Sequence, residues 1–321
     1  MNNEIIVFTH NDLDAISCMS NVDFALPQDR KVYFHTNYMN IVQRSDEVVR
    51  YQQQNRNTRI FVLDISFSGN KRELIDIINT GAEILFIDHH LYPEGYFEEL
   101  EQYPNFKYIH KIGYSAGLLT YAHFKNPGKN NNLDYFTKLV DKYDIWRKDD
   151  PEFQESQLLN EYFYRNVETM SIENLMKKFV SNDYGLPRDY ADTINIIKKE
   201  IVETKESMEK RKLIHRTPDI TIIFTDKYFN FVISDEFKAG RQCCIIANDW
   251  GIIRIRISEN STLTEEQKAF LRLELTGQED IGHENAFTYR VKNVSFDVII
   301  EEIKRCAEII QKELKKSEKL S

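Results

Sequence analysis

Residues 84–90 read Ile84-Leu85-Phe86-Ile87-Asp88-His89-His90, an apolar run that ends abruptly in an acid and two histidines. Short apolar runs without polar alternation are typical of strands buried on both faces, as in a parallel sheet. Two adjacent histidines directly after such a run have no packing role that we can name. The stretch therefore predicts a buried parallel strand that carries reactive side chains at its carboxyl end.

Three more apolar runs of this kind precede it in the chain, at residues 5–8, 31–35 and 60–63. Between the third run and residue 84, the apolar residues of 71–78 repeat at helical spacing, and Gly81 follows as a stop signal. Strand, helix and strand in succession predict a doubly wound α/β domain with a parallel sheet. We place this domain at residues 1–150.

The rest of the chain changes character after Pro151. Residues 152–213 have mostly helical patterns, and we interpret 151–214 as a helical connector whose charged end is a solvated helix. Strands are expected to resume after it, followed by helices at 265–275 and 296–316; the expected strands are 220–224, 231–233, 244–246 and 252–257. Residues 215–321 are therefore predicted to form a second, smaller α/β domain.

Composition limits the classes of function. The chain has 321 residues, with 42 Lys and Arg against 51 Asp and Glu, which gives a net charge of −9. This balance argues against a broad basic surface for long duplex nucleic acid. Apolar runs are far shorter than the ~18 residues of a membrane span, and the acidic start does not resemble a signal peptide. Four cysteines without a C-x-x-C pair favour a reduced, cytoplasmic setting.

Acids and histidines follow the predicted strands of the first domain. The first strand leads into His10-x-Asp12-x-Asp14, the third into Asp64, and the fourth into Asp88-His89-His90. The carboxyl ends of parallel strands converge on one crevice. Imidazoles and carboxylates together are ligands for Mn²⁺, Zn²⁺ or Fe²⁺. So many acids in one crevice would repel each other without cations, and two divalent ions about 3.5–4 Å apart suit phosphoester hydrolysis.

Further candidates lie outside these strand ends. Asp141 or Asp144 is expected to complete the shell of the second metal, and the choice between them stays open. Arg254 and Arg256 alternate with isoleucines, so both share one face of a strand and suit phosphate recognition, although a solvated strand face is the alternative. The segment Gly282-His283-Glu284-Asn285 can offer backbone amides and an imidazole to a phosphate, but a lone Gly-His pair is more often turn chemistry.

In these motifs the sequence resembles the DHH phosphoesterase superfamily. It is more similar to the small NrnB and NrnA oligoribonucleases than to the longer RecJ exonucleases. The resemblance rests on the four N-terminal motifs and, in the C-terminal part, on a likeness to the DHH-associated domain; the segments are Thr9 to Asp14, Asp64, Asp88 to His90, Asp141 and Gly282 to Ala286.

The resemblance implies an active site with two metal ions, Mn²⁺ or else Mg²⁺ or Co²⁺, in a cleft between the two domains. One ion would be held by His10, Asp12 and Asp64. The other would be held by Asp64 as the bridge and by three more ligands, Asp14, His89 and Asp141. A metal-bridging hydroxide would attack phosphorus, with Asp64, His89 and His90 as the catalytic residues. The substrate-binding residues would be His90, Arg254, Arg256, Gly282, His283 and Asn285.

The function expected from this resemblance is a metal-dependent phosphodiesterase that degrades short oligonucleotides, nano-RNA or short DNA, to mononucleotides. Alternatives with the same chemistry are 3′-phosphoadenosine 5′-phosphate, linear dinucleotides such as pGpG, and cyclic nucleotides. A non-catalytic nucleotide-binding module is the competing class, and the full ligand set argues against it. The expected partner is a short single-stranded substrate, with neither long duplex nucleic acid nor a membrane, and the oligomeric state, including a homodimer, stays open.

Overall fold

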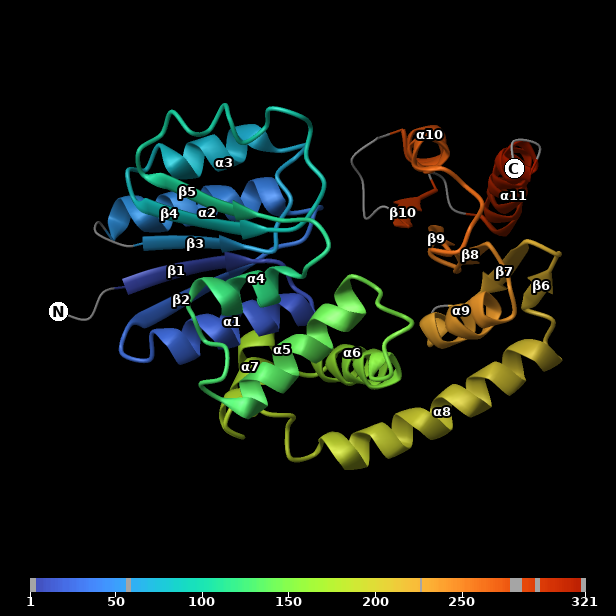
Figure 1. Ribbon diagram of the computed structural model, residues 1–321, viewed down its shortest axis with the longest axis horizontal. Helices are drawn as coiled ribbons and strands as arrows, with labels where there is room; N and C mark the ends of the chain where they lie inside the picture. Colours follow the sequence, from blue (N-terminus) through green and yellow to red (C-terminus); the bar gives the residue numbers. More distant parts are fainter. Residues whose placement is uncertain (1–3, 56–58, 226, 278–284, 292–294, 319–321) are drawn as a thin grey trace. The chain divides into compact units, whose positions relative to one another are not determined.

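The computed structural model describes residues 4–55, 59–225, 227–277, 285–291 and 295–318. The chain divides into two compact units, with the boundary between Asn195 and Ile196. Each unit contains one five-stranded sheet (Figure 1). This confirms the predicted mixed α/β fold with a parallel sheet in the N-terminal part.

The sheet of the first unit is parallel throughout. Its strands lie in the order β2-β1-β3-β4-β5; their bounds are β1 (Glu4–Thr9), β2 (Arg30–His35), β3 (Arg59–Leu63), β4 (Glu83–Asp88) and β5 (Phe106–His110). The four predicted strands are confirmed, and β5 is an addition at the sheet edge. Ile6, Val62 and Phe86 have no exposed surface, as expected for central strands covered on both faces.

Helices cover both faces of this sheet. Helices α2 (Ile41–Gln54) and α3 (Lys71–Ile78) pack against each other and share one core with the sheet. The opposite face is covered by α1 (Leu13–Ala25) and α4 (Ala116–His123), and α5 (Asn131–Asp144) packs on these two helices (Figure 1). The arrangement is therefore the doubly wound fold that the sequence predicts.

Two further helices belong to the first unit and not to a separate connector. Helix α6 (Phe153–Val167) packs on α5, and α7 (Ile172–Val180) packs on α1 and α6. Their apolar sides are buried there, with the rings of Phe136 and Phe179 4.5 Å apart. The first two helices of the expected connector 151–214 thus have partners in the N-terminal core.

Helix α8 (Tyr190–Lys210) contains the boundary between the units. Its buried residues Ile197, Ile201 and Met208 form an apolar stripe, while its charged residues are mostly exposed. Among the residues that the structure describes, no helix combines the length and the apolar composition needed to cross a bilayer.

The sheet of the second unit is mostly antiparallel, with only β7 and β8 paired in parallel. Its order is β10-β9-β8-β7-β6; the bounds are β6 (Ile214–Arg216), β7 (Ile220–Phe224), β8 (Cys243–Ala247), β9 (Ile252–Ile257) and β10 (Ala286–Arg290). Helices α10 (Glu265–Thr276) and α11 (Phe296–Glu318) pack on one face. Helix α9 (Phe229–Lys238) lies on the other face.

One predicted strand is wrong: residues 231–233 lie within α9. Three consecutive apolar residues are compatible with a strand and with a buried helix. The longer-range contacts resolve this ambiguity, because Glu236, one turn further along the chain, accepts hydrogen bonds from Thr221 on β7 and Arg216 on β6. These bonds hold the segment on the sheet as a covering helix.

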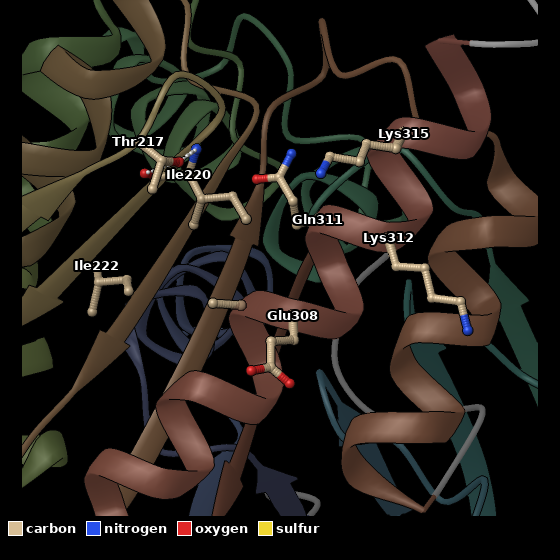
Figure 2. A pocket seen from close by; sticks show the side chains of 8 residues that line it. Thr217, Ile220, Ile222, Glu308, Gln311, Lys312 and Lys315 are labelled. Atoms are coloured by element: carbon tan, nitrogen blue, oxygen red, sulfur yellow. Dashed lines mark hydrogen bonds between the residues drawn. The ribbon is translucent and has the colours of Figure 1, made fainter.

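A pocket of about 520 Å³ lies in the second unit between β7 and α11 (Figure 2). Its apolar lining includes Ile220, Ile222 and Ala307, and Gln311, Lys312 and Lys315 contribute polar groups. None of its lining residues is among the candidate site residues that the sequence singles out.

Candidate metal centre

The candidate site lies at the carboxyl edge of the first sheet. The strand order changes direction between β1 and β3, so α1 and α3 leave their strands on opposite faces. Such a switch point opens a crevice at the ends of the strands, where ligands bind in open α/β sheets. His10 and Asp12 follow β1 at this point, and Asp64 follows β3.

The side chains that follow the strands meet there as predicted. Nδ1 of His10 lies 2.6 Å from Oδ2 of Asp12, and Nε2 of His89 lies 3.4 Å from Oδ1 of Asp64. Three groups have ligand atoms within 4.8 Å of one another: His10, Asp12 and Asp64; Asp14, His89 and Asp144; and Asp64, Asp88, His89 and His90. Asp64 and His89 each belong to two groups, so the groups form one connected cluster.

Asp64 has the features of a residue held in place for a ligand. Its φ of 59° is left-handed, and its backbone amide donates to the carbonyl of Ile87 at 3.0 Å. The residue is 2% exposed, and Oδ2 has no hydrogen-bond partner among the described residues. A buried carboxylate oxygen without a donor is costly unless a cation or water binds it.

Buried acids repel each other in this cluster. Burial, followed by the charges of Asp12 and Asp14, raises the pKa of Asp64 well above its usual value. Burial, and then the charge of Asp144, likewise raises the pKa of Asp14. Burial raises the pKa of Asp144 to about 8, with a contribution from Asp12. Divalent cations would reverse this penalty, since they stabilise the ionised carboxylates, so the donor set fits a metal site.

Asp88 serves His90. Oδ1 of Asp88 lies 2.7 Å from Nδ1 of His90, and the hydroxyl of Tyr92 donates to Oδ2 at 2.5 Å. Burial alone would lower the pKa of His90, but the charge of Asp88 raises it above its usual value. Nε2 of His90 lies 3.0 Å from the hydroxyl of Tyr38. His90 is therefore oriented by its neighbours and favoured in its cationic form.

The start of α4 holds Asp14. The backbone amide of Gly117 donates to Oδ1 at 3.0 Å and to Oδ2 at 3.2 Å. A Cβ atom at Gly117 would lie 2.6 Å from Oδ1 of Asp14 and 2.4 Å from Oγ of Ser17. The sequence places Gly117 in a run of small residues, but it does not show that the missing side chain makes room for a candidate ligand.

Asp144, and not Asp141, lies with the other candidate ligands. Its Oδ2 is 3.3 Å from Nε2 of His89. The carboxylate of Asp141 accepts instead from the amide of Ser115 at 2.8 Å and from Nε of Arg147 at 3.0 Å. Both acids lie near the end of α5, and the sequence spacing left the choice between them open. The geometry differs at this one position from the ligand set that the resemblance implies.

The substrate candidates of the second unit are described in part. Arg254 and Arg256 lie on one face of β9, alternating with the buried Ile253, Ile255 and Ile257, as the sequence predicts. The guanidinium carbon of Arg254 lies 5.0 Å from the ring centroid of Phe229. The backbone carbonyl of Asn285 accepts from Ile257 at 2.9 Å, whereas Gly282 and His283 lie outside the described residues.

Known proteins were compared with the chain by sequence and by structure. No protein-family model and no curated protein sequence matches it. It is similar to the solved structure of the pGpG-specific phosphodiesterase PggH from Vibrio cholerae, at 15% identity over 96% of this chain and 99% of that one, with a TM-score of 0.57. The exonuclease RecJ bound to manganese gives 12% identity, coverage of 96% and 90%, and a TM-score of 0.57. The chain shares the fold of these two proteins.

A second RecJ structure, from Thermus thermophilus in complex with Mn²⁺, agrees with this, at 13% identity and a TM-score of 0.56. The match covers 97% of this chain and 52% of that RecJ chain. At these identities the likeness shows the shared fold. The finer resemblance to NrnB and NrnA stays a prediction.

Proposed function

We propose that this chain is a metal-dependent phosphodiesterase that hydrolyses short single-stranded oligonucleotides to mononucleotides. The observation that carries the proposal is the buried cluster around Asp64, in which candidate ligands from three strand ends lie close to a carboxylate whose Oδ2 has no donor among the described residues. The names of PggH, a pGpG-specific phosphodiesterase, and RecJ, an exonuclease bound to manganese, support the same chemistry.

The residues of the cluster fit two divalent cations, for which we propose Mn²⁺, with Mg²⁺ or Co²⁺ as alternatives. His10, Asp12 and Asp64 would hold one ion, and Asp14, His89 and Asp144 would hold the other, with Asp64 near both. Asp144 takes the place that the resemblance gives to Asp141. When bound, such ions lower the pKa of water and neutralise charge on a phosphate.

Other residues of the chain prepare this site. Asp88 and Tyr92 hold His90 with its ring fixed and its cationic form favoured, which places a positive charge at the site and suits electrostatic attraction of a scissile phosphate. Gly117 orients Asp14 through its backbone amide. We assign phosphate contacts away from the metal ions to Arg254, Arg256, Gly282, His283 and Asn285, whose guanidinium, amide and imidazole groups suit phosphate oxygens.

A linear dinucleotide is the second candidate substrate. The observation in its favour is the similarity to PggH, which extends over 96% of this chain and 99% of that one. A dinucleotide and an oligonucleotide of a few units differ only in length. A series of substrates therefore separates them within one experiment.

The test is a length series of end-labelled strands from pGpG upward, with Mn²⁺, Mg²⁺ or Co²⁺. We expect mononucleotide release from short strands, a steep loss of rate as length increases, and loss of turnover in Asp64→Asn. Asp149→Asn, an acid outside the cluster, is the matched control and keeps wild-type turnover. Equal turnover in Asp64→Asn and wild type would refute the catalytic assignment, and tight nucleotide binding without turnover would favour the non-catalytic module.

A further inference from the structure

Tyr38 lies beside the cluster of candidate metal ligands, although no motif in the sequence points to it. It belongs to the loop between β2 and α2, and its hydroxyl lies 3.0 Å from Nε2 of His90. Its ring centroid lies 5.5 Å from that of His10, with the two planes at 41°. The side chain therefore contacts two histidines that the proposed function uses.

Hydrogen bonds fix the loop that carries Tyr38. Oγ1 of Thr36 and the amide of Asn37 both donate to Oδ1 of Asn40, at 2.9 and 2.8 Å. The amide of Met39 donates to Oδ1 of Asn37 at 2.9 Å. Such side-chain turns restrict the backbone, so the ring is positioned before a ligand arrives. A pre-positioned ring loses less conformational entropy on binding.

The ring presents an apolar surface beside a polar site. Tyr38 is 53% exposed although its hydroxyl is held at His90. The neighbouring candidate ligands offer imidazole nitrogens and carboxylate oxygens. A substrate whose phosphate lies at these ligands has its base or leaving group close by. An anchored aromatic ring with exposed surface at that place is what base stacking requires.

We propose that the ring of Tyr38 stacks on the nucleobase that adjoins the scissile phosphate, so that Tyr38 selects nucleotide substrates over base-free phosphodiesters. This inference rests on the proposed function and deepens it, because it assigns recognition of a base to the first unit. The hydroxyl has the separate role of holding the ring against His90.

The test measures equilibrium binding in the presence of Mn²⁺. The probes are a dinucleotide with a non-hydrolysable methylenephosphonate linkage and 2-aminopurine as one base, and a matched analogue in which that base is absent. We expect Tyr38→Leu to weaken binding of the first probe on the order of 10-fold and to remove its fluorescence quenching, with a much smaller effect on the second probe. Tyr38→Phe, which keeps the ring, and Met39→Ala, the exposed neighbour, should preserve the preference for the base.

Two results would overturn this assignment. Equal weakening of both probes by Tyr38→Leu would show that the ring does not read a base. Equal weakening by Phe and Leu would assign the effect to the hydroxyl at His90. Turnover is measured separately on a hydrolysable dinucleotide. Base-dependent binding without turnover would refute the proposed function alone. Turnover together with base-independent binding would refute only the role of Tyr38.

Discussion

Gly117 matters at the scale of single residues because it lies against a candidate ligand. We expect Gly117→Ala to displace Asp14 or α4, since the added Cβ would lie 2.6 Å from Oδ1 of Asp14. Manganese affinity should fall at least about 10-fold, as it does when a supporting contact of a ligand is lost. The free energy of unfolding should fall by about 1–3 kcal/mol from overpacking. Titration calorimetry and urea unfolding measure the two effects.

Gly69→Ala is the control for this substitution. A Cβ atom at Gly69 would have no heavy atom within 4 Å, and this residue is not among the glycines with positive φ. Its manganese affinity should equal that of the wild type. Unchanged affinity in Gly117→Ala as well would contradict the role given to Gly117.

Glu161 on α6 gives a pH-dependent prediction. Burial raises the pKa of its carboxyl to about 7, so the folded chain binds this proton more tightly than the unfolded chain, whose usual value is 4.5. The stability that the carboxyl contributes is therefore present below the unfolded value and is lost as the pH rises towards 7. We expect Glu161→Gln to be more stable than the wild type at pH 8, on the order of 1 kcal/mol, and to lose this advantage at pH 5. Urea unfolding at both pH values checks this, and a difference independent of pH would contradict it.

At the scale of elements, two acids near the end of α5 differ in the residues that they contact. Asp144 lies 3.3 Å from His89, whereas Asp141 is engaged by Ser115 and Arg147. We expect Asp144→Asn to weaken manganese binding at least about 10-fold and Asp141→Asn to have a much smaller effect. Competition with a fluorescent manganese chelator measures both. The opposite ranking would return the ligand role to Asp141.

The strand ends show how much of the candidate site can be predicted from the sequence. The apolar runs at residues 5–8, 60–63 and 84–87 predict buried parallel strands, and the rule that their carboxyl ends converge places His10, Asp64 and His89 together. Local pattern fails where a contact distant in sequence decides. Residues 231–233 belong to a helix that Glu236 ties to β7, and Tyr38 reaches His90 from a loop without a motif.

At the scale of the whole molecule, the candidate ligands all belong to the first unit, before Asn195. A cation that binds only the folded form stabilises it by mass action, by about 2.7 kcal/mol at a concentration 100 times the dissociation constant. We therefore expect manganese to raise the unfolding temperature of the unit that contains the parallel sheet, and EDTA to reverse this. Scanning calorimetry should resolve one metal-sensitive transition and one that does not move.

The matched control is the same scan of Asp64→Asn, whose transitions should respond little to manganese. Equal shifts of both transitions with the metal would contradict the assignment of all ligands to one unit. The net charge of −9 gives a weak general attraction for cations, and Ca²⁺ at the same concentration measures that background.

The left-handed backbone of Asp64 has a practical consequence for crystallography. Asparagine adopts positive φ as readily as aspartate does, so Asp64→Asn replaces a charged oxygen by an amide without straining the chain. The variant should therefore crystallise like the parent while leaving an uncut strand intact. Soaking such crystals would capture the true ligand in place and show its orientation directly.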